Sequence, residues 1–392
     1  MRLARRDRRN YSVLISLGMM TGSVYNSGRK DSRAMSDITR SQEFTREEVG
    51  LALRNHGMHL EGLRYPVTPI GMHYLLIHFD VPFVDPTAYE LPIEGSVRNP
   101  LRLTLDEIKA RPAVTTQVMM ECSGNGRASL QPRAISAPWQ DEAVGCAEWT
   151  GTPLAPILEE AGVLDEAVEI VFTGHDRGID DGVEHYYERS LPVEEALREE
   201  MLLAYGMNGQ PLPPQHGAPL RLIVPDWYGM ASVKWLKRIT VLNEPFDGIQ
   251  QTAKYQYKSS KEDPGTPITH KTPHALMIPP GLPDYLSRTR HLKPGRVSIQ
   301  GRAWSGRSPV ERVEFSSDGG LTWEDASLSE QAGKYGWAGW SYEWEAWEPG
   351  EYELCVRATD AAGDAQPLAP EESWNYGGYQ NNAVQRVYAI VE

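Results

Sequence analysis

Cysteine is scarce in this chain, and the few cysteines present fit neither a disulfide framework nor a zinc site. The 392 residues include three cysteines, Cys122, Cys146 and Cys355. A small, odd number argues against a set of disulfides and is typical of a reducing compartment. There is no C-x-x-C pair for structural zinc and no C-x-x-C-H motif for covalent haem. Each cysteine therefore has to be interpreted on its own.

Long apolar runs and an excess of positive charge are also missing. No stretch approaches the roughly 20 apolar residues of a membrane helix, so no membrane span is expected. The formal net charge is −14, and an acidic chain repels phosphates, so no nucleic-acid partner is expected. Residues 1–40 hold nine Lys/Arg and three Asp/Glu, a net of +6, which leaves −20 on the other 352 residues (−14 minus +6). An anionic ligand therefore has to meet a local basic pocket in an acidic body.

The first 40 residues differ from the rest of the chain in composition. The segment MRLARRDRRNYSVLISLGMMTGS has a basic start and an apolar run of only about ten residues, and no A-x-A-like cleavage site follows. We expect a basic, disordered tail over residues 1–40, with Met35 as an alternative start, in a cytoplasmic protein. A twin-arginine export signal around Arg8 and Arg9 is the alternative.

The length and the pattern of apolar residues predict an α+β protein with two domains. The chain exceeds the roughly 100–200 residues of a single domain. We expect a mixed α/β catalytic domain over residues 41–250 and a polar, Pro- and Gly-bearing linker over 251–290. Helices are predicted at 103–112, at 152–163 and at the start of 192–209, and strands at 168–174, 220–225 and 233–245.

Residues 291–392 have a different pattern. Polar and apolar residues alternate in short segments that Gly, Pro and Asp-Gly separate, and S-D-G-G at 317–320 predicts a hairpin turn. Seven of the eleven tryptophans lie here. Short strands at this spacing predict an immunoglobulin-like β-sandwich, although the Cys–Trp–Cys spacing of a true immunoglobulin domain is absent.

The sequence VTTQVMMECSGNGR (114–127) places Cys122 at the end of a predicted strand, ahead of a glycine-rich turn. A free cysteine is most often a packed thiol. Here, glycines allow a ligand to approach the backbone, such turns bind anions, and Arg127 adds a positive charge that favours the reactive thiolate. The residues alone leave three possibilities open: a packed thiol, a nucleophile or a metal ligand.

Several segments together resemble the sulfite oxidase family of molybdopterin enzymes. ECSGNGR (121–127) is similar to that family's molybdenum-ligand cysteine motif, and 204–239, with HGAPLR and VKWL, closely resembles its long signature. Further similar segments are its W-x-G-x-x-L block at 147–163, its active-site tyrosine segment at 186–192, and parts of its C-terminal dimerisation domain at 304–323 and 373–387. The resemblance covers residues 44–392 and implies a homodimer.

The resemblance implies a molybdenum cofactor, with one Mo per chain and no haem. Cys122 would be the only protein ligand of the metal, and a soft thiolate tunes a redox-active ion. Charge-assisted hydrogen bonds would hold the phosphate and pterin, and Gly124 and Gly126 would make room for the pterin. The implied cofactor-binding residues are His78, Asp176, His216, Arg221, Ser232 and Lys234.

The resemblance also implies roles on the substrate side. The Tyr187 hydroxyl would hydrogen-bond an oxo group or a bound anion, with Tyr186 as the competing, packing tyrosine. Arg127 would bind an anionic substrate beside the metal. Electrons would leave to a separate acceptor such as a cytochrome c, a quinone-linked partner or oxygen.

The chain departs from sulfite oxidases at two positions where that family has substrate arginines. Leu76 stands two residues before His78, and Gly377 stands in WNYGGY. Losing two positive charges weakens the binding of a dianion. The sulfane dehydrogenases and related bacterial enzymes also resemble TPIGMHY (68–74), so the cofactor is better supported than the substrate.

The expected function is therefore oxygen-atom transfer between molybdenum and a sulfur compound, with the oxidation of sulfite to sulfate as the first candidate. The same cofactor could instead serve an S-oxide or N-oxide reductase or a sulfane dehydrogenase. Two alternatives belong to other classes: a cofactor-free thiol hydrolase that uses Cys122, and a non-catalytic binding protein.

Metal analysis separates these hypotheses. Protein made in a host that synthesises molybdopterin should contain about one Mo per chain, and Cys122→Ser should lose it, because the substitution removes the only protein sulfur expected to bind the metal. A metal-free protein with full activity would contradict the molybdenum hypothesis and favour the hydrolase.

Overall fold

The structure is a computed structural model that describes residues 40–41 and 44–392. Met35 and the Arg8–Arg9 pair, and with them nearly all of the predicted tail, lie outside the described residues. From Thr39 onward the chain is one compact unit. Every helix in the described ranges is too short or too polar to cross a bilayer.

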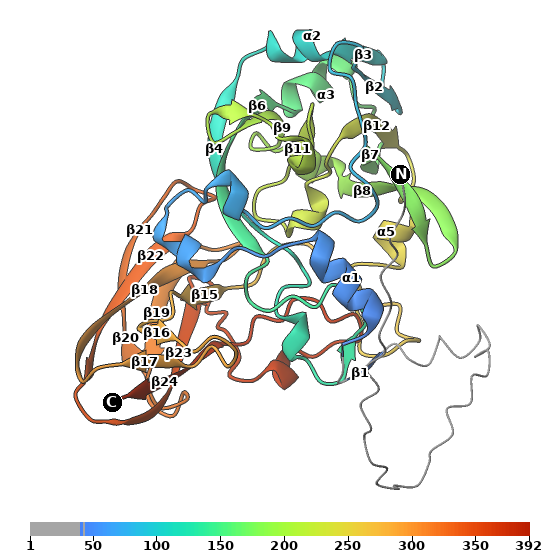
Figure 1. Cartoon of the computed structure of the whole chain (residues 1–392). Coiled ribbons are helices and arrows are strands. Elements are labelled where there is room, and N and C mark those ends of the chain that lie inside the picture. Colours follow the sequence, from blue (N-terminus) through green and yellow to red (C-terminus); the bar gives the residue numbers. More distant parts are fainter. Residues whose placement is uncertain (1–39, 42–43) are drawn as a thin grey trace, which may run out of the picture. The chain divides into compact units, whose positions relative to one another are not determined.

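The part of the chain before the sandwich contains two five-stranded sheets (Figure 1). The first has the order β10-β9-β6-β4, with β11 also paired to β9, and consists of β4 (Val114–Glu121), β6 (Val144–Pro153), β9 (Leu202–Met207), β10 (Gln210–Pro211) and β11 (Arg221–Ile223). The second has the order β3-β2-β12-β7-β8, in β2 (Glu90–Gly95), β3 (Leu101–Thr104), β7 (Glu169–Asp180), β8 (Val183–Pro192) and β12 (Leu236–Leu242). Within them only β12 and β2 pair in parallel, as far as the described residues show.

Local sequence signals explain where the short helices begin and end. Thr104 caps α2 (Leu105–Lys109) through a capping box with Glu107, and Gly162 ends α3 (Ala155–Ala161) at φ +68°. Such caps satisfy backbone groups that a helix leaves unpaired, and glycine tolerates the left-handed conformation. The helices predicted at 103–112 and 152–163 are therefore confirmed.

The prediction for 192–209 is right at its helical start and at its final turn, where Asn208 and Gly209 have positive φ, but it misses a strand between them. Helix α4 (Val193–Ala196) is one turn long, and LLAYGM forms β9 before the turn. β9 lies between β6 and β11 and is almost entirely buried. A short buried strand lacks the polar alternation of a half-exposed one, so periodicity cannot distinguish it from a buried helix.

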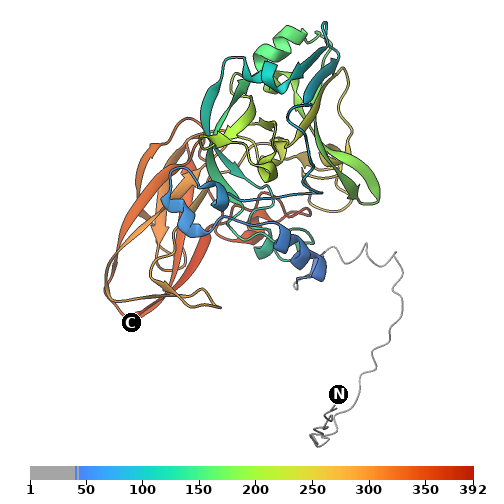
Figure 2. The same cartoon turned by 45° about the horizontal axis from the view of Figure 1, so that its top comes forward.

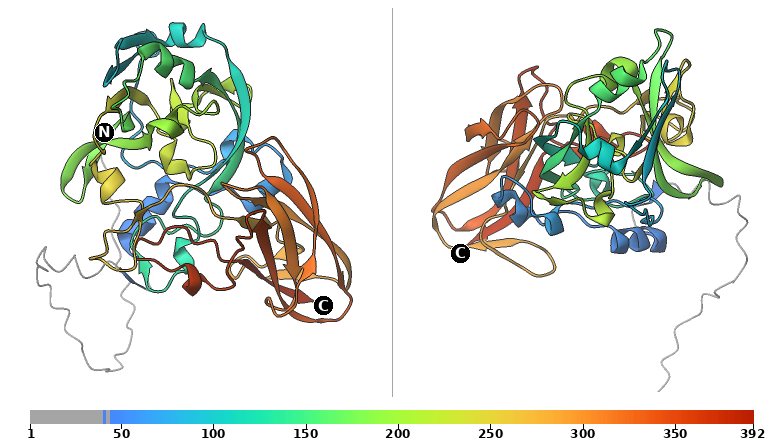
Figure 3. Two further views of the ribbon diagram at one scale, coloured as in Figure 1. Left: turned by 180° about the vertical axis from the view of Figure 1, so that it is seen from behind. Right: turned by 90° about the horizontal axis from the view of Figure 1, so that it is seen from above.

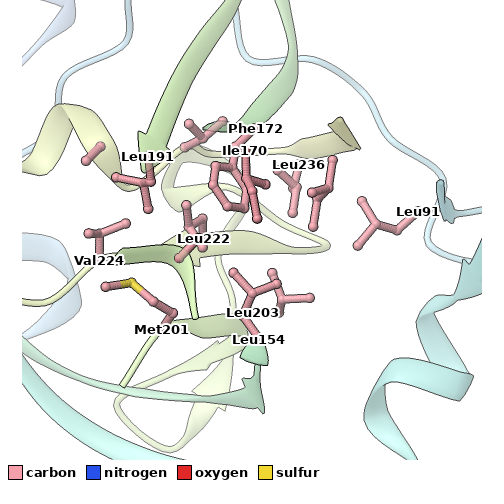
Figure 4. Packing of buried hydrophobic residues seen from close by; sticks show 14 of the residues in the cluster. Leu91, Leu154, Ile170, Phe172, Leu191, Met201, Leu203, Leu222, Val224 and Leu236 are labelled. Atoms are coloured by element: carbon pink, nitrogen blue, oxygen red, sulfur yellow. The ribbon is translucent and has the colours of Figure 1, made fainter. Parts of the chain in front are cut away.

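Apolar side chains from the two sheets and α3 form the main core (Figure 4). Leu91, Ile170, Phe172, Leu203 and Leu222 are fully buried in it, and each such side chain stabilises the fold by about 1.5–3 kcal/mol relative to its exposed state. This core fixes the strand ends from which the site residues project.

The C-terminal part is a two-sheet sandwich, which confirms the α+β prediction (Figures 1 and 2). One sheet has the order β15-β18-β22-β21, in β15 (His274–Met277), β18 (Gly295–Trp304), β21 (Ser327–Gln331) and β22 (Ala338–Ala346). The other has the order β16-β17-β24-β23-β19-β20, in β16 (Leu282–Pro283), β17 (Arg290–Leu292), β19 (Val310–Ser316), β20 (Glu324–Asp325), β23 (Gly350–Asp360) and β24 (Gln385–Val391). The predicted turn at 317–320 joins the antiparallel strands β19 and β20.

The range predicted as a linker, 251–290, contains several short strands. These are β13 (Gln256–Tyr257), β14 (Thr266–Pro267) and the sandwich strands β15 and β16. Helix α5 (Ile249–Thr252), which overlaps the start of the range, packs on β8. Polar composition with Pro and Gly indicated a connector, but the segment also supplies a buried tyrosine to the site described below.

A buried ion pair anchors the first described helix. Helix α1 (Arg46–Arg54) starts at a capping box between Thr45 and Glu48, and Glu48 pairs with Arg133 of β5 (Arg133–Ala134), which itself pairs with β1 (Arg40–Ser41). Glu48 and Arg133 are 0% and 1% exposed. Burial acts to raise the pKa of Glu48, but hydrogen bonds from Arg133 and Thr45 outweigh it, so the pKa lies below its usual value.

Glu48→Gln should destabilise the protein, because glutamine keeps the capping box but removes the carboxylate that pairs with the buried Arg133. We expect a loss of roughly 3 kcal/mol, measured as a lower Tm at pH 7. Because the folded pKa is depressed, the contribution of the pair is present above the unfolded value of 4.5 and disappears as the pH falls through the folded value. Glu47→Gln, an exposed neighbour in the same turn, is the control, and equal Tm values for both variants would contradict the role of the pair.

Candidate active site

Cys122 follows directly after β4, and backbone hydrogen bonds fix the turn that carries it. Its N–H donates to the Ala143 carbonyl (2.9 Å), and its carbonyl accepts from the Asn125 N–H (2.9 Å). The side chain is 7% exposed. It lines two adjoining cavities, together with Leu76, His78 and Tyr255.

The smaller of the two cavities, of about 60 Å³, is called the inner cavity below, and the larger is called the outer cavity. The inner cavity brings together eight of the nine predicted site residues. These are Cys122, His78, Asp176, Tyr187, His216, Arg221, Ser232 and Lys234. They come from β7, β8, β11, the Cys122 turn and the loops around 78, 216 and 232. The ninth, Arg127, lines the larger or outer cavity of about 680 Å³ with Cys122.

Arg221 crosses the inner cavity between two loops that the chain folds together. Its Nη1 and Nη2 donate to the carbonyls of His216 and Ser232 (both 2.9 Å), and its guanidinium lies 4.7 Å from the Trp149 ring centroid. Its buried Nε has no acceptor among the described residues. Burial lowers the pKa of Arg221 to about 10, which leaves it a cation with a free donor.

Lys234 and Asp176 place opposite charges on the same cavity. Lys234 Nζ donates to the Leu76 carbonyl (2.6 Å) and more weakly to Gln215 (3.4 Å), while Asp176 Oδ1 is buried without a donor in the described structure. Burial raises the pKa of Asp176 and lowers that of Lys234, each to about 7. Both groups are therefore poised to exchange protons or bind a ligand near neutral pH.

Two histidines face each other in the inner cavity, and one of them was not predicted. The rings of His73 and His216 are 5.5 Å apart, edge to face. Burial, with nearby positive groups, lowers the pKa of His73 to about 4 and that of His216 to about 2. His73 Nε2 is buried without a partner among the described residues. His73 lies in TPIGMHY. The resemblance of that segment to related enzymes was noted, but it did not identify His73 as a residue of the cavity.

His78 is held between two tyrosines. It stacks on Tyr187 with centroids 4.5 Å apart, and its Nε2 is 2.6 Å from the Tyr255 hydroxyl. The Tyr187 hydroxyl donates to the Met230 carbonyl (2.8 Å) rather than standing free. Tyr255, at φ +54°, belongs to the predicted linker, and no sequence pattern indicated its place here.

The two adjacent tyrosines of β8 point to opposite sides, as strand geometry requires. Tyr187 is 4% exposed and faces the inner cavity. Tyr186 lies outside it, with Lys237 Nζ 3.6 Å and Arg177 5.2 Å from its ring centroid. Tyr187 therefore lines the cavity, while its role toward an oxo group or a bound anion stays a prediction. Tyr186 was expected to be the packing residue of the pair, but Tyr187 is the more buried of the two.

The two glycines of the Cys122 turn make room for protein atoms. A Cβ on Gly124 would lie 2.5 Å from Arg127 Nη1, and one on Gly126, at φ +74°, would lie 2.9 Å from Asn381. These contacts by themselves already require glycine at both positions, and the expectation that the two glycines accommodate a pterin stays a prediction. Arg127 itself donates to the carbonyls of Gly378 (3.0 Å) and Ala137 (3.2 Å) and lies 5.0 Å from the Tyr379 ring centroid.

Burial dominates the electrostatics of the Cys122 thiol in the chain alone. Burial raises its pKa, and this effect outweighs the positive charge of Arg127, which lowers it. The predicted thiolate therefore needs a further positive charge, such as a metal ion, at the sulfur. Within residues 40–41 and 44–392, no three His, Cys, Asp or Glu side chains are grouped to hold a metal, so such an ion has to bring other ligands with it.

Neutral and aromatic residues line the outer cavity beside Cys122. Leu76 packs with Cys122 and Trp139. Gly377 also lines this cavity, and a Cβ there would lie 2.5 Å from the Tyr379 ring. The positions of the two absent arginines therefore do converge on one cavity, together with Arg127.

The residues of the inner cavity suit a ligand that carries both an anion and polar ring edges. Arg221 Nε and His73 Nε2 are buried without hydrogen-bond partners among the described residues, and the unpaired Asp176 oxygen can accept a hydrogen bond. Buried polar atoms normally have partners, so this concentration indicates a missing ligand. The inner cavity also shares Leu76, His78, Cys122 and Tyr255 with the outer cavity, so the two adjoin.

Comparisons with known proteins point in the same direction. Residues 78–250 match the "Oxidoreductase molybdopterin binding domain" and residues 280–392 the "Mo-co oxidoreductase dimerisation domain". The chain is 34% identical over 343 residues to mitochondrial sulfite oxidase of Drosophila melanogaster (82% of this chain, 58% of that protein). It is 30% identical over 344 residues to sulfite oxidase of Arabidopsis thaliana (82% and 87%).

The chain covers 58% and 62% of the length of the first animal relatives it matches, those of Drosophila melanogaster and Mus musculus. Among solved structures, it is similar to the sulfane dehydrogenase SoxCD from Paracoccus pantotrophus. The TM-score is 0.74 at 24% identity, over 95% of this chain and 96% of that one. At this identity the likeness shows the fold alone.

Proposed function

The chain belongs to the sulfite oxidase family of molybdopterin oxidoreductases, and on that premise we propose that it transfers an oxygen atom to or from a sulfur compound at a molybdenum ion bound by Cys122. The single observation that carries this proposal is the position of the Cys122 thiol, on the wall shared by the basic inner cavity and the outer cavity. A metal there can be reached from one side by its cofactor and from the other by substrate.

The inner cavity would hold the molybdenum cofactor, which when bound supplies the two-electron redox change. Arg221 and Lys234, with His216 and Ser232, would donate hydrogen bonds to its phosphate and pterin. The free oxygen of Asp176 would accept from pterin amino groups. His78 and Tyr187 would then flank the metal side of the site, stacked on each other.

The outer cavity would bind the substrate, and sulfite is the first candidate. Arg127 supplies a buried cation on its wall, and Lys254, Lys258 and Lys261 lie further out on the same wall. Lys254 is already paired with Asp180 and Asp181, so its charge is largely compensated. Arg127 is therefore the proposed anion-binding residue nearest the metal.

One observation favours a second candidate, a neutral or bulkier sulfur oxide. Leu76, Trp139 and Gly377 leave a roomy wall with little charge, and pockets of several hundred Å³ typically accept organic ligands. An S-oxide or N-oxide reductase on the same cofactor would suit this wall better than an enzyme for a small dianion.

The C-terminal sandwich would form a homodimer, as the name of its domain family indicates. Its outer surface carries exposed apolar side chains, among them Leu282, Tyr285, Leu286 and Tyr388. A separate acceptor such as a cytochrome c would take the electrons. Three unpaired cysteines support a cytoplasmic location, with twin-arginine export as the alternative.

Lys234→Met tests the cofactor assignment. It removes one charged donor from the inner cavity, and a hydrogen bond to a charged group contributes about 1.5–3 kcal/mol, so Mo should dissociate roughly ten- to hundredfold faster. The measurement is Mo per chain during extended dialysis. Lys237→Met is the matched control, because Lys237 lies on the same segment but over Tyr186, outside both cavities. Equal loss from both variants would contradict the assignment.

Substrate assays on Mo-loaded protein test the reaction itself. With an artificial electron acceptor we expect turnover of sulfite, and with a reduced dye the turnover of dimethyl sulfoxide measures the second candidate. Leu76→Arg should raise kcat/KM for sulfite at least about tenfold, since it returns a cation to the wall beside Cys122. Leu51→Arg adds the same charge elsewhere on the outer cavity and serves as control. Mo-loaded protein that turns over neither substrate would overturn the proposed reaction.

A further inference from the structure

Glu121, the residue before Cys122, has a buried carboxylate that accepts hydrogen bonds from three residues. It is 2% exposed. Its Oε1 accepts from Asn125 Nδ2 (3.1 Å) and His274 Nδ1 (3.0 Å), and its Oε2 accepts from Trp304 Nε1 (2.8 Å). No Lys or Arg nitrogen of the described residues lies within 4.0 Å of it. A charge buried this way persists only where every donor is in place.

One side of this carboxylate holds the Cys122 turn. The amide of Asn125 donates to Glu121 Oε1, while its oxygen accepts from the Ala143 N–H (2.9 Å). Ala143 also receives the Cys122 N–H on its carbonyl. Asn125 thus connects the Glu121 carboxylate to the Cys122 turn and to Ala143, the residue whose carbonyl accepts the Cys122 N–H.

The other side belongs to the C-terminal sandwich. His274 and Trp304 pair directly across β15 and β18, each is 1% exposed, and their rings are 5.1 Å apart. Both donors therefore lie on the paired strands β15 and β18. Their hydrogen bonds to Glu121 connect this strand pair to the end of β4.

Further backbone contacts from the sandwich fix the same stretch. The Met119 N–H donates to the Tyr335 carbonyl (2.8 Å), and the Gln380 N–H donates to the Ser123 carbonyl (2.7 Å). Asn381 Nδ2 reaches the Gly126 carbonyl (2.7 Å). In Figures 1 and 3 the chain after β4 lies near the red loop that precedes β24, the loop to which Gln380 and Asn381 belong. The sulfur-bearing turn is thus built by both halves of the chain.

We propose that Glu121 is a positioning residue that locks the Cys122 turn to the sandwich and so fixes the geometry of the metal-bound sulfur. The sandwich then has a second role besides joining two chains. The proposal rests on the proposed function for its metal consequence, but the locking itself can be measured without metal. Glutamine at this position offers one acceptor oxygen and two donor hydrogens, so it cannot satisfy three N–H donors at once.

The first experiment uses cofactor-free full-length chain and hydrogen–deuterium exchange. Glu121→Gln should speed amide exchange in the peptide that covers residues 122–129 at least tenfold and leave α3 unchanged. Glu314→Gln is the matched control, since Glu314 is an equally buried carboxylate (3% exposed) held by Arg312 and Arg357 within the sandwich. Unchanged exchange at 122–129 in Glu121→Gln, or an equal rise there in Glu314→Gln, would overturn the proposal.

The second experiment measures the Mo content, the Mo(V) signal and the activity of variants loaded with Mo. In Mo-loaded Glu121→Gln we expect about one Mo per chain, a shifted or broadened Mo(V) electron paramagnetic resonance signal, and kcat lowered about tenfold with KM unchanged. Trp304→Phe removes one donor and keeps the carboxylate, so it should show a smaller change of the same kind and provides a folded variant if Glu121→Gln is too unstable. An unaltered signal and kcat in both variants would overturn the positioning role. Wild-type protein without Mo would instead refute the proposed function, while the exchange result would still decide the locking.

Discussion

The site depends on one constraint: cationic and polar side chains are buried around the inner cavity without enough opposite charge inside the protein. Arg221, Lys234, His73 and His216 share it with one carboxylate, Asp176. Burial keeps the histidines neutral and brings the lysine and aspartate close to their neutral forms. Burying polar groups without partners costs free energy, and a bound ligand that supplies the partners removes this cost. An anionic, polar-edged cofactor provides the groups that these residues lack.

The two parts of the chain meet at the Cys122 turn. β4 carries Cys122 to the end of a sheet, where a turn would otherwise be free to move. The sandwich closes on that turn through Tyr335, Gln380 and Asn381, and through the carboxylate of Glu121. A Cβ at Gly124 would collide with Arg127, and a Cβ at Gly126 would collide with Asn381.

Much of the site could be predicted because its chemistry is local in sequence. The segment from His216 to Lys234, on and around β11, holds four of the predicted cavity residues, and Cys122 stands at a recognisable strand end. His73 and Tyr255 escaped prediction, since a lone histidine near a turn and a tyrosine in a polar segment look like ordinary packing. Strand β9 escaped because a short buried run carries no period of its own.

The sequence by itself determined the residue types, the caps at Thr104 and Gly162, the alternation that makes the sandwich, and the motifs that identify the family. Which groups are left unsatisfied depends on the tertiary structure, because partners such as the Leu76 carbonyl for Lys234 or Trp304 for Glu121 lie far along the chain. The tertiary structure also decided that Tyr187, and not Tyr186, faces the cavity, and that burial outweighs Arg127 at the thiol. Desolvation depends on what surrounds a group in space, and a linear sequence does not carry that information.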